Sequence, residues 1–306
     1  MKKKKGELIT FAGKLPALKI SGFTIVRNIT LNDYPALEAI LSILPIVDEL
    51  IVLVGDSQDD TVERIQTLDS SKIKIIHSVW DKSMIEGGSV LAAETNKAKN
   101  FLSPDSDWLL YIQADEILHE KDYPVILEAA SLHLNNPRVE GLLFNYLHFY
   151  ASYNYIGDSR TWYHQEVRMI RNDPRIQSYR DAQGFRKQGK KLRVKAIEAC
   201  VYHYGWVKSP LKMQEKRKQA ALLWQERQDL RQELQTQELF DYAAFDSLTT
   251  FKGTHPAVMR QRIALQNWEV SLDLSQKKFS WTGKLLYWFE KRTGLRPFAF
   301  KNYRII

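Results

Sequence analysis

Two continuous apolar runs constrain the fold of this chain most strongly. Residues 50–54 read LIVLV and residues 108–112 read WLLYI, and aspartate follows each run within three residues. Apolar runs of this length, without alternating polar side chains, are typical of parallel strands that are covered on both faces. Shorter runs rich in β-branched residues at 23–26 and 73–76 predict two more strands.

Helical patterns separate the four predicted strands. Residues 37–44 place leucine and isoleucine at the i, i+3, i+4, i+7 spacing of an amphipathic helix, and similar patterns occupy 62–68 and 91–102. Strands that alternate with helices imply right-handed βαβ units, and therefore an α/β fold with a Rossmann-like, mostly parallel sheet flanked by helices. Such sheets bind ligands beyond the carboxyl ends of their strands, so we expect the site just after residues 26, 54, 76 and 112.

The single cysteine excludes several classes of protein. Cys200 stands alone among 306 residues, which excludes an intrachain disulfide framework and a cysteine-based zinc site. It also favours a reducing compartment. Apolar runs are too short or too interrupted to predict a signal peptide or a membrane span. We therefore expect a soluble, cytoplasmic protein.

Positive charge is concentrated in two segments. Residues 168–195 hold ten Lys/Arg against two acids, and residues 277–304 hold eight Lys/Arg and eight aromatics against one glutamate. Such patches attract phosphates, anionic lipid or nucleic acid, and a solvated basic surface is the alternative. Because the chain contains no nucleic-acid recognition motif, we expect no nucleic-acid partner.

Acidic, turn-forming residues follow two of the predicted strands. Residues 55–61 read GDSQDDT, and residues 113–116 read QADE. Carboxylates at a strand end can hold a hard cation such as Mg²⁺, which neutralises a departing diphosphate. The alternative is that Asp115 and Glu116 cap the next helix. Neither loop has the glycine pattern of a Rossmann dinucleotide site or of a P-loop.

The order of these motifs resembles family 2 glycosyltransferases of the GT-A fold. The resemblance rests on Arg27-Asn28, the strand and loop at 50–61, Gly87-Gly88, Thr95-Asn96 and the segment at 108–116. It covers residues 20–150 and continues more weakly to about residue 262. It implies a GT-A-type catalytic domain.

The resemblance implies a nucleotide-diphosphate-sugar donor and the residues that bind it. Asp56 matches the acid that contacts the base, after a one-residue gap in the loop, and Asp115 matches the last aspartate of the D-x-D motif, which binds metal and diphosphate. The implied donor-binding residues are Arg27, Asn28, Asp56, Asp59, Asn96 and Asp115.

The resemblance also implies a divalent cation, Mg²⁺ or Mn²⁺. Its candidate ligands are Asp115, Glu116 and His203. Gln113 replaces the first aspartate of the D-x-D motif, and Glu116 can share the task. His203 lies where several related enzymes complete the metal site, and its imidazole suits Mn²⁺ better than Mg²⁺. A packing role is the alternative for His203.

An inverting transfer requires a carboxylate that accepts the proton of the acceptor hydroxyl. Asp181 is our first candidate, because it lies in a polar, glycine-containing stretch between Arg180 and Arg186, and Glu166 is the second. The alternative for either residue is an ion pair with the neighbouring arginines. Seven aromatic residues between 146 and 163 suit stacking on a sugar or packing in the core.

Three regions are predicted along the chain: an N-terminal extension over 1–18, a GT-A catalytic domain over 19–210, and a helical, basic C-terminal region over 211–306. Within the catalytic domain, residues 19–120 would bind the nucleotide sugar and residues 121–210 the acceptor. The C-terminal region begins with a long helix predicted over 213–240. Its last residues, from 280 onward, combine aromatic and basic side chains, which suits peripheral contact with the inner face of a membrane or packing onto the catalytic domain.

These observations lead to one functional hypothesis and one alternative. The hypothesis is a metal-dependent, inverting glycosyltransferase that moves a sugar to a hydroxyl of a carbohydrate or lipid-linked acceptor, in polysaccharide, cell-surface glycan or glycolipid synthesis. The alternative is a non-catalytic nucleotide-sugar-binding protein of the same fold, which Gln113 favours.

Overall fold

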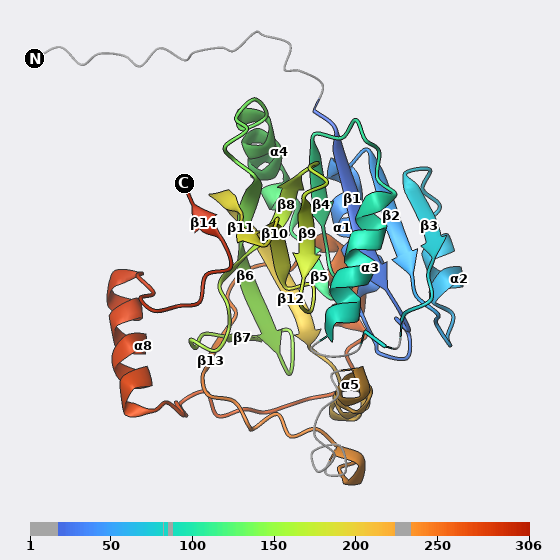
Figure 1. The fold of residues 1–306 in the computed structure, drawn as a ribbon. Coiled ribbons are helices and arrows are strands. Elements are labelled where there is room, and N and C mark those ends of the chain that lie inside the picture. The colour runs from blue at the N-terminus through green and yellow to red at the C-terminus, as the bar shows by residue number, and fades with distance from the viewer. Residues whose placement is uncertain (1–17, 82, 85–87, 224–233) are drawn as a thin grey trace, which may run out of the picture.

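The structure, a computed structural model, describes residues 18–81, 83–84, 88–223 and 234–306 (Figure 1). Nearly all of the predicted N-terminal extension therefore lies outside the described residues. The same holds for Gly87 and for residues 224–233 of the long helix predicted over 213–240.

Four strands form the parallel half of the main sheet. They stand in the order β4-β1-β2-β3, and every neighbouring pair among them is parallel. Each of them matches a predicted strand, and their carboxyl ends meet at one edge of the sheet. Their bounds are β1 Ile20–Val26, β2 Glu49–Val54, β3 Ile73–His77 and β4 Trp108–Tyr111.

Helices cover both faces of this half-sheet, which explains why β2 is apolar at every position from 50 to 54. Its even-numbered side chains lie in the core cluster of α1, and its odd-numbered side chains lie in the cluster that α3 covers. The helices that follow the strands are α1 Ala36–Ile43 with η1 Leu44–Ile46, α2 Thr61–Gln66, and α3 Ser89–Asn100.

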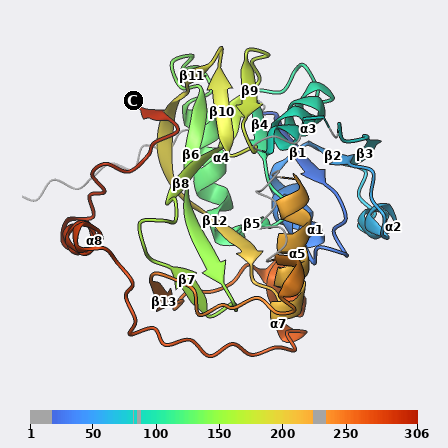
Figure 2. The same ribbon diagram turned by 60° about the horizontal axis from the view of Figure 1, so that its bottom comes forward.

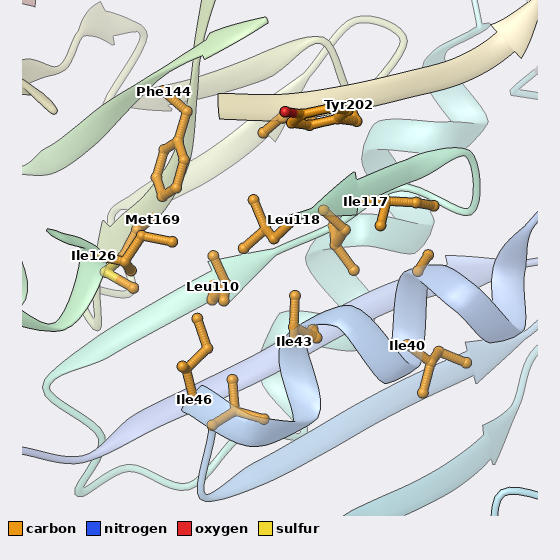
Figure 3. Close-up of a cluster of buried hydrophobic side chains, with 14 of the residues drawn as sticks. Ile40, Ile43, Ile46, Leu110, Ile117, Leu118, Ile126, Phe144, Met169 and Tyr202 are labelled. Atoms are coloured by element: carbon orange, nitrogen blue, oxygen red, sulfur yellow. The ribbon is translucent and has the colours of Figure 1, made fainter. Parts of the chain in front are cut away.

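The larger core cluster joins α1 to the sheet and to α4 (Tyr123–Leu132), which follows η3 (Glu120–Asp122). Figure 3 shows Ile40 and Ile43 of α1 facing apolar side chains from several other elements, among them Leu110, Ile117, Leu118, Ile126, Phe144 and Met169. Burial of each such side chain stabilises the fold by about 2 kcal/mol. The cluster therefore holds α1 and α4 on the same face.

The remaining strands form a mixed half of the sheet. β8 is antiparallel to both β4 and β6, while the long β12 runs parallel to β6 and antiparallel to β5. A small separate sheet has the order β11-β10-β9. The bounds are β5 Glu116–Leu118, β6 Gly141–Tyr150, β7 Tyr155–Gly157, β8 Gln165–Arg171, β9 Ile176–Tyr179, β10 Gly184–Lys187, β11 Lys190–Lys191 and β12 Arg193–Trp206.

The C-terminal region contributes strands to the main sheet as well as helices. β13 (Leu248–Thr250) pairs with β7, and β14 (Arg304–Ile305) pairs with β12. The region is therefore not purely helical, and a boundary near residue 210 stays a prediction. Its helices are α5 Pro210–Leu223, η4 Ala257–Met259, α7 Arg260–Ala264 and α8 Trp281–Thr293.

The predicted fold class is confirmed: an α/β fold whose Rossmann-like parallel strands are flanked by helices and continue into a mixed sheet. The alternative that Asp115 and Glu116 cap a helix is wrong, because Glu116 begins β5. Within the described ranges, none of the helices combines the length and hydropathy that a membrane span requires.

Candidate functional site

A cleft of about 350 Å³ opens at the carboxyl ends of the parallel strands, where the strand order placed the site. Residues that follow β1 and β4 line one side of it, and the β9–β10 turn and α5 line the other. The polar residues that line the cleft include Arg27, Asn28, Asn32, Tyr34, Gln113, Asp115, Tyr163, Arg168, Asp181, Gln183 and Lys216.

Asp115 lies close to two basic side chains in the cleft, those of Lys216 and His203. One of its carboxylate oxygens, Oδ2, lies 3.6 Å from Lys216 Nζ and 3.7 Å from His203 Nε2. Burial opposes ionisation of this carboxyl, but Lys216, Lys208 and the His203 ring, which is protonated at the acidic pH where Asp115 titrates, outweigh it and lower the pKa of Asp115 below the ordinary value. Asp115 therefore stays ionised at neutral pH.

The backbone of β12 approaches this carboxylate closely at Gly205. A Cβ atom there would lie 2.5 Å from Asp115 Oδ2 and 2.9 Å from the His203 ring. A side chain at position 205 would therefore displace one of these two groups. Glycine is required here by space rather than by backbone conformation.

The hydrogen bonds of His148 determine which nitrogen of His203 faces Asp115. His148 Nε2 lies 2.8 Å from the carbonyl oxygen of Tyr163, which only accepts, so this nitrogen carries the proton. Burial lowers the pKa of His148 well below its usual value, so the ring is neutral and its Nδ1 accepts from His203 Nδ1 at 3.1 Å. Burial also lowers the pKa of His203, and its Nε2 therefore presents a lone pair toward Asp115.

This donor set fits a divalent cation in part. An ionised carboxylate and an imidazole lone pair that face each other are two ligands of the kind that Mn²⁺ accepts, and a hydrogen bond to the second nitrogen is typical of ligating histidines. Across the described stretches, no group of three or more His, Cys, Asp or Glu is arranged around one point. Any further ligands would therefore come from diphosphate oxygens and water.

Glu116 does not belong to this donor set, which corrects its predicted role as a metal ligand. Its carboxylate is fully buried and accepts two hydrogen bonds from Arg168, of 2.7 and 2.8 Å. It also accepts from the Tyr146 hydroxyl at 2.8 Å and from the amide nitrogen of Gln113 at 3.1 Å. With these partners Glu116 holds Arg168 at the wall of the cleft rather than a cation.

The residues expected to bind the nucleotide lie together beside Trp80. Arg27 Nε lies 3.2 Å from Asp56 Oδ1, and the Arg27 guanidinium carbon lies 5.2 Å from the centroid of the Trp80 ring. Asn28 accepts from the amide nitrogen of Gln58 at 2.7 Å, which fastens the end of β1 to the loop after β2. The structure therefore brings Arg27, Asn28 and Asp56 together, and Arg27 and Asn28 line the cleft.

Asp59 and Asn96 hold loops in place and do not line the cleft. Asp59 accepts from the amide nitrogens of Thr30 and Leu31, both at 2.9 Å, and from the Thr61 hydroxyl. Burial opposes ionisation of the Asp59 carboxyl, but these hydrogen bonds outweigh it and lower its pKa. Asn96 forms two hydrogen bonds with the backbone of Ser178, of 2.8 and 3.1 Å, and so joins α3 to β9. Their predicted contact with the donor stays a prediction.

The two candidate bases lie in different surroundings. Asp181 lines the cleft from the β9–β10 turn, where Arg180 and Ala182 on either side have positive φ angles of 55° and 58°. Glu166 is buried in β8 and is not among the cleft residues; burial raises its pKa to about 7. Of the two candidates, Asp181 lines the cleft and Glu166 does not.

Sequence reasoning missed several residues that line the cleft, among them Trp80, Tyr34 and Lys216. Trp80 follows β3, at one of the strand ends where we expected ligand contacts, so its position was available as a signal. Tyr34 and Lys216 carried no such signal, because they reach the cleft from a loop and from a helix that had no predicted role in the site. Lys216 also donates to the Gly205 carbonyl oxygen at 2.8 Å.

Comparisons with known proteins give structural likenesses only. No protein-family model and no curated protein sequence matches the chain. Among solved structures, S. aureus TarS 1-349 is 12% identical, covers 71% of this chain and 69% of its own, and has a TM-score of 0.36. A glucosyl-3-phosphoglycerate synthase from Mycobacterium tuberculosis, solved with Mn²⁺, UDP and phosphoglyceric acid, is 20% identical over 43% of this chain and 44% of its own, with a TM-score of 0.30.

The TarS structure has also been solved with UDP, at the same TM-score of 0.36. The chain spans less than half the length of the matched synthase. Because the TM-scores are below 0.5, these likenesses are not used to assign a function. The function is inferred from the residues of the cleft.

Proposed function

We propose that this protein is a glycosyltransferase that moves a sugar from a nucleotide-diphosphate donor to a hydroxyl group of a carbohydrate or lipid-linked acceptor. One observation carries the proposal: the ionised Asp115, flanked by Lys216 and the lone pair of His203, at the carboxyl ends of parallel strands. An anionic diphosphate needs cationic partners at such a position, and a carboxylate needs a cation between itself and that diphosphate.

The donor would lie across the strand ends, with its base near Asp56 and its diphosphate near Asp115. Arg27 and Trp80 offer a cation and an aromatic face at the base end of the cleft. Asp115 and His203 would hold Mn²⁺ or Mg²⁺, which supplies positive charge to the leaving diphosphate when bound. Lys216 would add a second positive charge, and its amine is kept protonated because Asp115 and Tyr34 outweigh the effect of burial and raise its pKa.

The transfer would be a single displacement with inversion. The acceptor oxygen forms a bond to the anomeric carbon while the bond from that carbon to the diphosphate oxygen breaks. Asp181 accepts the proton that the acceptor hydroxyl loses. We favour Asp181 over Glu166, because Asp181 lines the cleft and Glu166 does not. Such a reaction serves polysaccharide, cell-surface glycan or glycolipid synthesis.

A non-catalytic nucleotide-sugar-binding protein is the second candidate. The observation that favours it is Gln113, which stands at the first position of the acidic motif and donates to the carbonyl oxygen of Ala182 at 3.3 Å. In that position an amide ties the β9–β10 turn to β4 and provides no negative charge for a cation. Binding of a donor without transfer to any acceptor in a broad panel would support this candidate.

Replacement of Asp115 tests the proposal. UDP-glucose with Mn²⁺ is a suitable first probe among nucleotide sugars. We expect the donor with Mn²⁺ to raise the melting temperature of the wild-type chain, because a ligand stabilises the state that binds it. The Asp115→Asn variant should lose this shift and should lose turnover by at least about 100-fold, since one charge-stabilising contact contributes about that much.

Asp105→Asn is the matched control, because its carboxylate is exposed and lies at the opposite end of the strands. The control should keep both the melting shift and the turnover. Near-normal turnover in Asp115→Asn would overturn the assignment of Asp115. If no nucleotide sugar shifts the melting temperature of the wild-type chain, the proposed donor class is wrong.

A further inference from the structure

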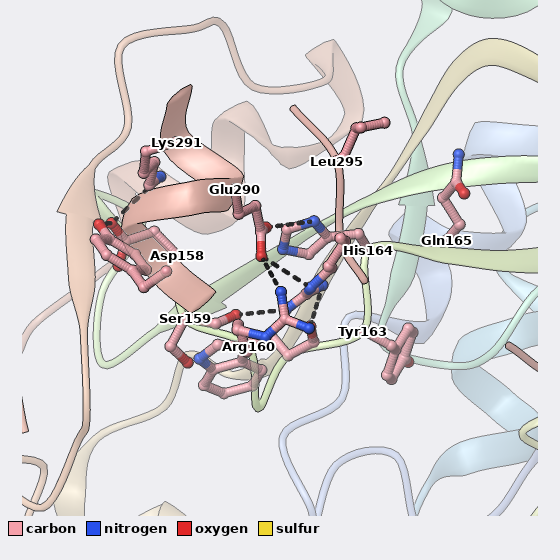
Figure 4. A network of polar contacts seen from close by, with 12 residues as sticks. Asp158, Ser159, Arg160, Tyr163, His164, Gln165, Glu290, Lys291 and Leu295 are labelled. Carbon is pink, nitrogen blue, oxygen red and sulfur yellow. Dashed lines mark hydrogen bonds and ion pairs between the residues drawn. The ribbon is translucent and has the colours of Figure 1, made fainter. Parts of the chain in front are cut away.

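Several buried polar contacts attach α8 to the rest of the molecule. Glu290 accepts from Arg160 at 2.8 Å and lies 3.3 Å from Arg296 Nε (Figure 4). One turn earlier, the hydroxyl of Tyr287 donates to Asp158 at 2.7 Å. The side chains of Glu290 and Asp158 are only 12% and 8% exposed, so these contacts are shielded from water and fix the orientation of the helix.

One apolar face of α8 points away from the protein. Trp281, Leu285 and Trp288 follow helical spacing and are 78%, 55% and 56% exposed. No residue of α8 is buried, whereas a surface helix ordinarily turns its apolar stripe toward the core. Leu286 and Phe289 of the same helix are half-buried. The side chains of Trp281, Leu285 and Trp288 therefore form a second apolar face, which is left exposed.

The segment that follows α8 also exposes apolar side chains. Leu295, Phe298 and Phe300 are 64%, 92% and 67% exposed between α8 and β14. Both overall views place α8 and β14 at the edge of the molecule opposite to β3 and α2 (Figures 1 and 2). Single exposed apolar residues are ordinary, but a set of this size concentrated in one segment indicates an interaction surface.

Basic side chains surround the exposed aromatics. Lys284 and Arg292 are exposed on α8, and the Arg292 guanidinium carbon lies 5.6 Å from the Trp288 ring centroid. At the other end, Lys191 Nζ lies 5.6 Å from the Phe300 ring centroid. The one acid among residues 277–304, Glu290, points inward. The surface is therefore aromatic, aliphatic and positively charged at once.

We propose that this surface, formed by α8 and residues 295–301, binds the protein to an anionic lipid bilayer. Tryptophan and phenylalanine suit the interfacial layer of a membrane, where leucine reaches the acyl chains, and lysine and arginine meet the headgroup phosphates. Contact with a membrane would bury the exposed apolar face of α8 without disturbing the contacts of Glu290 that hold the helix. The inference does not depend on the reaction proposed for the cleft.

Charge argues against the other occupants. A second copy of the chain that covered this face with its own would bring Lys284, Arg292 and their counterparts together, and like charges repel. Single-stranded nucleic acid would suit the aromatic rings and cations, but Leu285 and Leu295 offer nothing to stack on a base. A bilayer with negative headgroups accommodates all of these side chains.

Flotation of the full-length chain with lipid vesicles tests the proposal, with no donor added. We expect binding to vesicles of phosphatidylcholine mixed with phosphatidylglycerol, and at least about tenfold weaker binding to phosphatidylcholine alone. The double variant Trp281→Ser, Trp288→Ser should weaken binding to the anionic vesicles at least about tenfold. Lys284→Gln should weaken it about fivefold, the effect of one basic residue near a charged surface.

Matched controls use residues of the same kind elsewhere on the surface. Val79→Ser with Leu132→Ser removes two side chains that are 74% and 73% exposed, and Lys252→Gln removes one exposed lysine. These controls should bind like the wild type, and circular dichroism should show all variants folded. Equal binding by wild type and the tryptophan variant would overturn the proposal. A second result would also overturn the proposal. In it, the wild type does not bind vesicles but self-associates in light scattering without vesicles, and the tryptophan variant does not self-associate.

Discussion

At the scale of single residues, Glu166 shows how burial changes the chemistry of a carboxyl group. It is 3% exposed in β8, with Arg168 as its charged neighbour and Asn302 as a hydrogen-bond partner at 3.5 Å. Burial outweighs these contacts and raises its pKa to about 7 from an ordinary value of 4.5. A carboxyl group of this kind is neutral in mildly acidic solution and is forced to ionise in the core as the pH rises.

This shift predicts a pH dependence of stability. Because the folded state has the higher pKa, the stability that Glu166 contributes is fully present below pH 4.5 and is lost as the pH rises through about 7. The loss corresponds to about 3 kcal/mol of unfolding free energy. Glu166→Gln removes this titration, so urea unfolding at pH 5 and pH 8 should show the variant gaining stability relative to wild type at the higher pH.

A difference between variant and wild type that stays constant from pH 5 to pH 8 would contradict this assignment. Glu140→Gln is a useful control, because Glu140 is also poorly exposed but its pKa is lowered: burial opposes the shift, and Arg193 and Lys187 outweigh it. The stability that Glu140 contributes is lost only as the pH falls below 4.5, the ordinary pKa of a glutamate. The Glu140→Gln control should therefore show no such gain in stability relative to wild type between pH 5 and pH 8.

At the scale of secondary-structure elements, the short strand β14 closes one edge of the structure. Arg304 and Ile306 donate their amide protons to the carbonyl oxygens of Leu192 and Val194, at 2.8 and 3.1 Å. Just before the strand, Asn302 is 4% exposed and accepts from the Tyr179 hydroxyl at 2.6 Å. β14 and Asn302 thus connect β12 to the small sheet.

Deletion of residues 302–306 should therefore lower stability. The deletion removes the backbone pairing of β14 and exposes the buried side chains around Glu166, and we expect a loss of about 3 kcal/mol in unfolding free energy. Ile305→Ser is the control, because this side chain is 49% exposed and the backbone pairing remains. It should change stability by no more than about 0.5 kcal/mol. A deletion as mild as the control would show that β14 does not stabilise the fold.

At the scale of the whole molecule, strands from distant parts of the chain share one sheet. β1 to β4 come from the first 111 residues, while β13 and β14 come from beyond residue 247, and β8 and β6 link the two groups. The cleft also combines residues that are distant in the sequence, because Asp115 follows β4 and Lys216 lies on α5. A continuous sheet favours one cooperative unit over separable domains.

We accordingly predict one unfolding transition. Hydrogen exchange measured along a urea series should show amides of β2 and of β12 becoming exposed at the same denaturant concentration, because both strands belong to the same sheet. The predicted boundary near residue 210 would instead allow β13, β14 and their neighbours to open first. Two transitions separated in urea would contradict the single unit and support that boundary.

The site was predictable where it follows directly from a strand. Arg27, Asn28 and Asp115 come immediately after apolar runs, and the carboxyl ends of parallel strands converge, so their convergence needed no knowledge of long-range packing. Glu116 shares the acidic pattern with Asp115, but the Glu116 carboxylate is buried and pairs with Arg168, 52 residues later. Sequence pattern does not reveal which acid a buried arginine will pair with.

What the sequence by itself determined about this protein is the parallel half-sheet and the edge at which its polar loops gather. Periodicity and turn residues report locally which faces are buried, and that is sufficient for β1 to β4. Only the tertiary structure decided the partners of Asp115, the orientation of His203 through His148, and the outward direction of the apolar face of α8. These depend on how β12, α5 and α8 pack against residues far away in the chain, and no local pattern encodes that packing.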